Sequence, residues 1–237
     1  MRSAALSPAD PSPVQPSPAR PADFLAINVA TANADPASVC AIGLVHFKAG
    51  QIGRQFKFLV DPQAEFDAGN VALHGVRPES IAGAPSFPKI YPALAQAFAT
   101  TVVVHHSYFD RFALGRAAER HRLPAPQCAW LDSAFVVRQT WPRFAARGFA
   151  LKNLARAFGI ELIHRDPCED ARVAGMILLR AMAENGLTLD ALIARFEQQA
   201  LRHTSVLRAA HVKFAQRASP WAVISAPRAA GAAKSGG

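Results

Sequence analysis

The chain has 237 residues, of which 51% are hydrophobic, so it is long enough for one well-packed domain with extensions. The formal net charge is +9, and no apolar run approaches the roughly 20 residues of a membrane span or makes a signal peptide near the first residue. Three widely separated cysteines, Cys40, Cys128 and Cys168, argue against a disulfide framework, so we expect a cytoplasmic protein without disulfides.

Secondary structure is expected to begin near residue 23, because residues 1–22 are rich in Pro, Ala and Ser and should form a disordered tail. Three strands are predicted next, over 24–30, 39–48 and 55–60, and they should form an antiparallel meander with a turn at Ala49-Gly50. The elements that follow are a helix over 85–99, a strand over 101–105, a helix over 107–122, a strand over 127–131, and helices over 132–139, 151–158 and 170–184. Strands followed by such alternation predict an α/β fold in which helices flank a mixed sheet.

Two of these helices have apolar residues at helical spacing. The helix over 85–99 is expected to bury Ile90, Leu94 and Phe98. The helix over 107–122 is expected to turn Phe109, Phe112 and Leu114 inward.

The C-terminal segment differs from the rest in charge. Residues 187–237 carry a net charge of +5, compared with +3 for residues 23–186. A basic helical extension is predicted over 187–218, with Thr188 as its N-cap, followed by a flexible tail over 219–237. The helix needs an apolar surface to cover, which could belong to its own domain, a second copy or another protein. The positive charge favours phosphate-bearing partners, although an Arg-rich solvated surface would give the same composition.

Four segments point to a known family. Residues 24–31 read FLAINVAT, 71–76 read VALHGV, 104–110 read VHHSYFD and 165–171 read RDPCEDA. They resemble the motifs of the DEDD-type 3′–5′ exonucleases, in the DnaQ-like and RNase T-like group with a histidine base, and the resemblance covers about residues 23–185. It implies a ribonuclease H-like fold, and a cleft in which four carboxylates hold two Mg²⁺ or Mn²⁺ ions that cleave a 3′-terminal phosphodiester.

The chain departs from these motifs at three of the five catalytic positions. Asn28 and Ala30 stand where the family has Asp and Glu, and Arg165 stands where it has the histidine base. Asp110 and Asp170 match the two remaining acids. Because an arginine cannot accept a proton and two ligands are missing, we expect weak metal binding or none and no cofactor, with Mg or Mn needed only if residual activity remains.

These departures predict a degenerate, catalytically inactive exonuclease that acts as a nucleic-acid-binding or adaptor module. The expected ligand is a single-stranded 3′ end, and the residues expected to contact it are Thr31, His74, His106 and Arg165. Two alternatives remain open: an active exonuclease with an altered metal site, and a protein-binding scaffold that forms a homodimer or docks a partner through its C-terminal helix.

A further alternative keeps a transition metal. His105, His106 and His164 could converge with Asp110 and Asp170, because imidazole and carboxylate groups suit Mn, Fe or Zn. Without a metal, Asp110 could instead cap its helix, and Asp170 could pair with Arg165 or Arg172.

Overall fold

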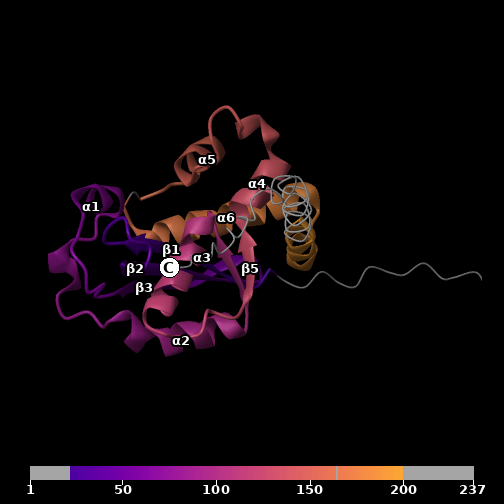
Figure 1. The fold of residues 1–237 in the computed structure, drawn as a ribbon. Coiled ribbons are helices and arrows are strands. Elements are labelled where there is room, and N and C mark those ends of the chain that lie inside the picture. The colour runs from indigo at the N-terminus through magenta and orange to yellow at the C-terminus, as the bar shows by residue number, and fades with distance from the viewer. Residues whose placement is uncertain (1–21, 164, 200–237) are drawn as a thin grey trace, which may run out of the picture. The chain divides into compact units, whose positions relative to one another are not determined.

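The computed structural model of the protein describes residues 22–163 and 165–199. A five-stranded sheet forms its centre, in the order β3-β2-β1-β4-β5 (Figure 1). The strands are β1 (Phe24–Thr31), β2 (Val39–Lys48), β3 (Gln51–Leu59), β4 (Val102–His105) and β5 (Ala129–Asp132). The first three are antiparallel neighbours, whereas β4 and β5 continue the sheet parallel to β1. The predicted mixed sheet is therefore confirmed.

Helices lie on both faces of this sheet. They are α1 (Ala68–His74), α2 (Phe87–Ala99), α3 (Tyr108–Arg120), α4 (Ser133–Thr140), α5 (Leu151–Phe158) and α6 (Pro167–Asn185), and short 3-10 turns span Pro78–Ile81 and Pro142–Phe144. Most agree with the predicted ranges, but β3 begins four residues earlier than predicted and α6 three residues earlier.

Helix α1 was not predicted, and its two caps explain why it forms. The Asp67 side chain accepts a hydrogen bond from the Gly69 backbone N–H, and Gly75 ends the helix in the left-handed conformation with φ 73°. A helix of seven residues without a buried residue has no apolar periodicity to reveal it. The caps were the only signal, and they are typical of helix ends.

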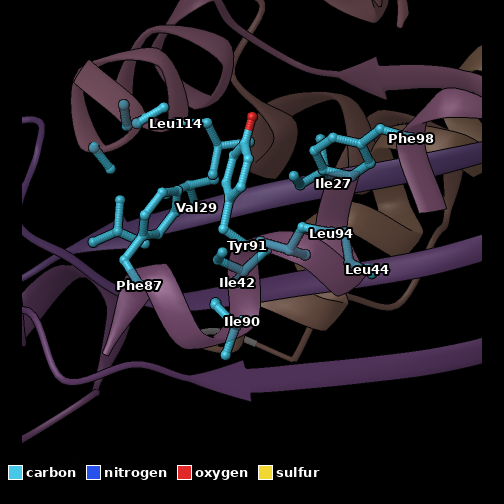
Figure 2. Packing of buried hydrophobic residues seen from close by; sticks show 14 of the residues in the cluster. Ile27, Val29, Ile42, Leu44, Phe87, Ile90, Tyr91, Leu94, Phe98 and Leu114 are labelled. Atoms are coloured by element: carbon cyan, nitrogen blue, oxygen red, sulfur yellow. The ribbon is translucent and has the colours of Figure 1, made fainter. Parts of the chain in front are cut away.

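The main core lies between the sheet and helices α2 and α3. Ile90, Leu94 and Phe98 of α2 are buried as predicted and pack toward Ile27 and Val29 of β1 (Figure 2). Odd-numbered residues of β1 point to this side, because successive side chains of a strand alternate between its faces.

The prediction for α3 was wrong in part. Leu114 is buried, but Phe109 is 42% exposed and Phe112 is 38% exposed. The buried side of α3 consists mainly of small side chains, among them Ala113 and Ala117. These allow the helix to approach the sheet closely, and the two rings remain on its outer side.

Helix α6 covers the opposite face through two close contacts at glycine. A Cβ at Gly43 of β2 would lie 2.2 Å from the backbone of Pro167, and a Cβ at Gly175 would lie 2.2 Å from the ring of Phe47. Only glycine fits at distances this short. Gly43 therefore lets the first turn of α6 rest on the sheet beside Asn28, its partner in β1.

The C-terminal helix starts as predicted: Thr188 caps it, with Thr188 Oγ1 accepting from the Ala191 backbone N–H at 3.2 Å. Leu189 and Leu192 are buried, and the compact unit ends at Ala194. The first turns of this helix therefore pack on their own domain. No helix in the described ranges is long and apolar enough to cross a membrane. The predicted N-terminal tail, the helix beyond residue 199 and the C-terminal tail lie outside the described residues.

Candidate nucleic-acid interface and degenerate metal site

The candidate site lies where β1 meets the first turns of α3 and α6. Asp110 is in the first turn of α3, where Ser107, rather than Asp110, caps the helix. The Asp110 carboxylate reaches across to β1: Oδ1 accepts from the Val29 backbone N–H at 2.8 Å and from the Asn28 side-chain Nδ2 at 3.3 Å. Two of the five predicted positions are thus joined by a direct contact.

Burial dominates the electrostatics of Asp110, which is 2% exposed. Desolvation raises the pKa of this carboxyl to about 7, against the hydrogen bond from Val29, which lowers it. The negative charges of Asp170 and Asp132 raise the pKa further. Asp170 is therefore close enough to act on Asp110 through space, and the structure brings Asn28, Asp110 and Asp170 together.

The neighbours of Asp170 fix the first turn of α6. Asp166 caps the helix by accepting from the Cys168 backbone N–H at 2.8 Å, and it pairs with Lys57 of β3 at 3.0 Å. Glu169 pairs with Arg172 at 2.8 Å. Arg172, one of the two arginines considered as partners of Asp170, thus has an acidic partner next to Asp170 in the same turn.

Ala30 brings no polar atom to the site. It is 4% exposed and lies opposite Ala41 in β2, within a small apolar cluster that includes Ala32, Cys40 and Val76. A carboxylate at this position would have to displace apolar neighbours or turn toward Asp110. The Ala30 methyl group instead packs within this apolar cluster.

A two-metal centre requires several anionic oxygen ligands around each pair of ions. Across residues 22–163 and 165–199, no group of three or more His, Cys, Asp or Glu side chains lies close enough to hold a metal ion. One of the two retained acids, Asp110, has an oxygen that already accepts two hydrogen bonds. The described donors do not match the ligand set that the family implies.

His74 and Thr31, both expected to contact nucleic acid, are tied to each other. His74 Nδ1 accepts from the Val76 backbone N–H at 3.1 Å, so Nε2 carries the proton and donates to the Thr31 carbonyl at 3.0 Å. Burial lowers the pKa of His74, which is consistent with a neutral ring. Asn70, which the sequence did not suggest, adds hydrogen bonds to the Thr31 carbonyl and hydroxyl. Both expected contact residues therefore hold α1 on the end of β1.

His106 lies inside the domain and not on a nucleic-acid surface. It is 8% exposed, its Nδ1 lies 2.9 Å from Ser133 Oγ, and its Nε2 donates to the Phe149 carbonyl at 2.7 Å. Its neighbour His105 is 2% exposed and donates from Nδ1 to the Ser107 carbonyl. Both rings hold neighbouring loops, which removes His106 from the expected contacts, and among the described residues neither ring belongs to a group of side chains that could hold a metal ion. His164 lies outside the described residues.

Arg165 occupies an exposed turn with φ 69°, a conformation that few non-glycine residues adopt. Its side chain lies against Gly75, where an added Cβ would come within 3.1 Å of the Arg165 Cβ. Arg165 lines a pocket formed with α1 and the turn that follows it. The structure thus turns this residue toward the end of α1.

Three aromatic rings on the outer side of α3 are a feature that the sequence did not reveal as exposed. Tyr108 is 67% exposed and stacks on Phe112 at a centroid distance of 5.7 Å, with Phe109 next to them. The signal was present, because Tyr108 and Phe112 are one turn apart, but their apolar character suggested burial. Exposed aromatic side chains are typical of binding surfaces.

A known protein matches most of this chain in sequence. The "Putative bifunctional exonuclease/endonuclease protein MT2247" of Mycobacterium tuberculosis is 28% identical over 189 residues, which cover 77% of this chain and 29% of that protein. The chain thus spans less than a third of the length of this relative.

Solved structures show the same fold. Exonuclease X in complex with 5′-overhanging duplex DNA aligns with a TM-score of 0.58 at 17% identity, covering 72% of this chain and 98% of that one. A 3′-exonuclease that recognises the 3′ end of a histone mRNA stem-loop aligns at 0.59 and 15%, covering 71% and 84%. The RNase T exonuclease family model matches residues 29–178, more than half of the chain, and this protein therefore belongs to that exonuclease family.

Proposed function

We propose that this protein binds single-stranded nucleic acid with an exonuclease fold and does not cleave it. One observation carries the proposal: Asn28 Nδ2 donates to Asp110 Oδ1 at the position where the family holds its metals. The amide donates a hydrogen bond to the carboxylate, and this offsets part of the free-energy cost of burying the charge without a metal ion. Ala30 adds no ligand, so the remaining acids lack the charge that would attract two divalent cations.

The loss of acidic groups also favours binding of a phosphate backbone. A cleft with fewer carboxylates repels phosphates less, and the whole chain has a net charge of +9. Tyr108, Phe109 and Phe112 provide exposed rings on the outer side of α3, on which unpaired bases can stack. DNA in the exonuclease X complex and RNA in the stem-loop complex support nucleic acid as the ligand class.

A second candidate function is that of an active exonuclease with an altered metal site. Two acids of the family set remain, and the negative charge of Asp170 raises the pKa of Asp110, which supports this alternative. Two carboxylates would bind a single ion with lower affinity than four carboxylates bind a pair of ions. Calorimetric titration with Mg²⁺ and Mn²⁺ separates the two functions, because the binding protein should show no saturable metal binding.

Fluorescence anisotropy with a labelled single-stranded oligonucleotide tests the proposed function. Tyr108→Ala and Phe112→Ala should each weaken binding by about 10-fold or more, since a base stacked on an aromatic ring contributes roughly 1–3 kcal/mol. Ile52→Ala is the matched control, because Ile52 is a similarly exposed apolar residue on β3. Affinity should fall steeply as salt rises. If the parent does not bind DNA or RNA at low salt, the proposal fails and the protein-binding scaffold is favoured.

A further inference from the structure

One edge of the sheet is formed by β3, and residues 51–57 of this strand are all exposed. Within the described ranges, no further strand pairs with β3 (Figure 1). An edge strand presents backbone N–H and C=O groups without a ladder partner, which makes it a template for another strand. The hydrogen bonds between β2 and β3 determine which of these groups point outward.

Alternate residues of β3 turn their backbone groups away from β2. The Val60 N–H donates to the Cys40 carbonyl at 2.9 Å, so this opposed pair is hydrogen-bonded. Hydrogen-bonded and non-hydrogen-bonded pairs alternate along an antiparallel ladder, so Phe56 and Phe58 also bond to β2. The residues whose N–H and C=O groups point to the open edge are Gln55, Lys57 and Leu59.

The open edge begins after a β-bulge. β3 has two residues between Ile52 and Gln55, whereas β2 has only one between Phe47 and Val45, the partners of these two residues. The extra residue of a bulge bends and twists its strand and interrupts the regular ladder. A strand that adds to this edge therefore starts its regular pairing at Gln55.

The open edge ends before Asp61. The Asp61 backbone N–H donates to the Pro85 carbonyl at 3.0 Å, and Asp61 forms a parallel bridge with Ser86. The loop before α2 therefore occupies the edge at this position. Between the bulge and this loop the edge is open over residues 55–59, and about five residues is a common length for a strand.

The side chains of the open edge combine aromatic surface with positive charge. Phe56 lies opposite Leu44, is 46% exposed, and stacks on the half-buried ring of Phe58 at a centroid distance of 6.4 Å. Lys57 points to the other face of the sheet, where it pairs with Asp166 at 3.0 Å. β3 has two basic residues and no acidic one. A strand that covers this edge therefore needs apolar side chains opposite the two rings and a negative charge opposite Lys57.

A second copy of this chain does not supply that negative charge. An antiparallel pairing of two copies over residues 55–59 places each Lys57 opposite the Lys57 of the other copy. Like charges directly opposite each other destabilise a strand pair, and lysines in edge strands are one means by which proteins avoid self-association. The exposed pair of Lys57 with Asp166 contributes little, so the ammonium group can contact a second carboxylate as well.

We propose that residues 55–59 bind an extended segment of a partner protein in which an acidic residue lies between two apolar residues. The segment adds an antiparallel strand to the sheet, with its acidic side chain opposite Lys57 and its apolar side chains opposite Phe56 and Phe58. In complexes of this kind, main-chain hydrogen bonds give affinity and alternate side chains give specificity. The α3 rings take no part, so this protein partner is additional to the proposed nucleic-acid ligand.

NMR titration of the isotope-labelled full chain with the acetylated and amidated peptide Thr-Val-Glu-Val-Thr tests the proposal. The amide signals of Gln55, Lys57 and Leu59 should shift with saturation at millimolar peptide, because their N–H groups gain acceptors. The signals of Phe56 and Phe58 should shift less, because their N–H groups already donate to β2.

Two methylated peptides distinguish strand pairing from side-chain contact. In the proposed pairing the Glu N–H of the peptide points to Lys57, so its N-methylation should weaken binding by at least about 10-fold. The N–H of each peptide Val points away from β3, and N-methylation of one Val should change the affinity by less than about 2-fold.

A peptide with Gln in place of Glu tests the charged pair. The parent should bind the Glu peptide about 2–5-fold more tightly than the Gln peptide, whereas Lys57→Gln should bind both equally. Arg54→Gln is the matched control, because it removes the same charge from the bulge, outside the open edge, and should keep the preference for Glu.

Four results would overturn the proposal. They are no saturable shift of the three amides, equal losses from the two methylations, equal affinity of the parent for the Glu and Gln peptides, and a shift of the same amides with protein concentration alone. The last result would identify a second copy as the occupant of the edge. None of these results depends on whether oligonucleotides bind to the α3 rings.

Discussion

Asn28→Asp should make the protein less stable as the pH rises, although the substitution restores the aspartate that the family has at this position. The substitution replaces the donor that contacts Asp110 Oδ1 at 3.3 Å with a second carboxylate. With an effective dielectric constant of about 20, two charges at this distance repel each other by about 5 kcal/mol. The hydrogen bond to the Asp110 carboxylate, a charge-assisted contact of roughly 1.5–3 kcal/mol, is lost as well.

Protonation limits this cost and gives it a characteristic pH dependence. Asp110, with a pKa of about 7, can take up a proton and share it with the new carboxylate. Keeping Asp110 protonated requires no free energy at pH 5, where it is below its pKa, and about 1.4 kcal/mol at pH 8, one unit above the pKa. The raised pKa means that folded Asp110 binds its proton more tightly than the unfolded chain, so the parent loses stability between about pH 4 and 7 and then stays level. Asn28→Asp should continue to lose stability above pH 7.

Urea denaturation between pH 5 and pH 9 without divalent metal measures this difference. We expect Asn28→Asp to be destabilised by about 1.4 kcal/mol more at pH 8 than at pH 5. The control Asn28→Ala removes the donor without adding charge, and should lose no more than the roughly 1.5–3 kcal/mol of that hydrogen bond. A parallel profile for Asn28→Asp would show that Asn28 does not contact Asp110 and would refute the reasoning.

Three further predictions concern the framework around the site. Gly43→Ala should lower the free energy of unfolding by about 1–3 kcal/mol in the same assay, because its Cβ would lie 2.2 Å from Pro167; an unchanged value would refute that contact. His74→Phe should lower the free energy of unfolding by about 1–3 kcal/mol, because it removes the hydrogen bond to the Thr31 carbonyl of β1 and the one accepted from the Val76 backbone N–H, and hydrogen exchange of the 68–74 amides should rise. A chain ending at Ala194 should keep the parent's cooperative unfolding, whereas one ending at Gly186 should be destabilised by the loss of buried Leu189 and Leu192; equal stability would place these leucines outside the core.

The strands and most helices could be predicted in their order along the chain, because the periodicity of apolar residues reports burial directly. The α2 stripe was correct since its large residues face the sheet. For α3, periodicity failed because alanines form the buried side and two of the large rings, Phe109 and Phe112, remain outside. Sequence pattern alone cannot distinguish a ring that packs into a core from one that serves a surface.

The candidate site could be predicted in position but not in its contacts. The family resemblance placed Asn28, Asp110 and Asp170 at one site, and in the structure Asn28 contacts Asp110, whose pKa is raised by the charge of Asp170. The sequence could not show that His106 is buried, because its two hydrogen-bond partners, Ser133 and Phe149, lie 27 and 43 residues away in the chain. Hydrogen bonds between residues so distant in sequence depend on tertiary packing, and no local pattern encodes them.

Digestion of a labelled single-stranded oligonucleotide, followed base by base in Mg²⁺ and then Mn²⁺, tests directly whether the protein binds nucleic acid without cleaving it. We predict that the protein retains the strand in a complex while its 3′ end stays intact over hours, with either metal. Progressive shortening from the 3′ end that depends on metal and is abolished in Asp110→Asn and Asp170→Asn would contradict it. That result would show that the two retained acids still support the chemistry of the family.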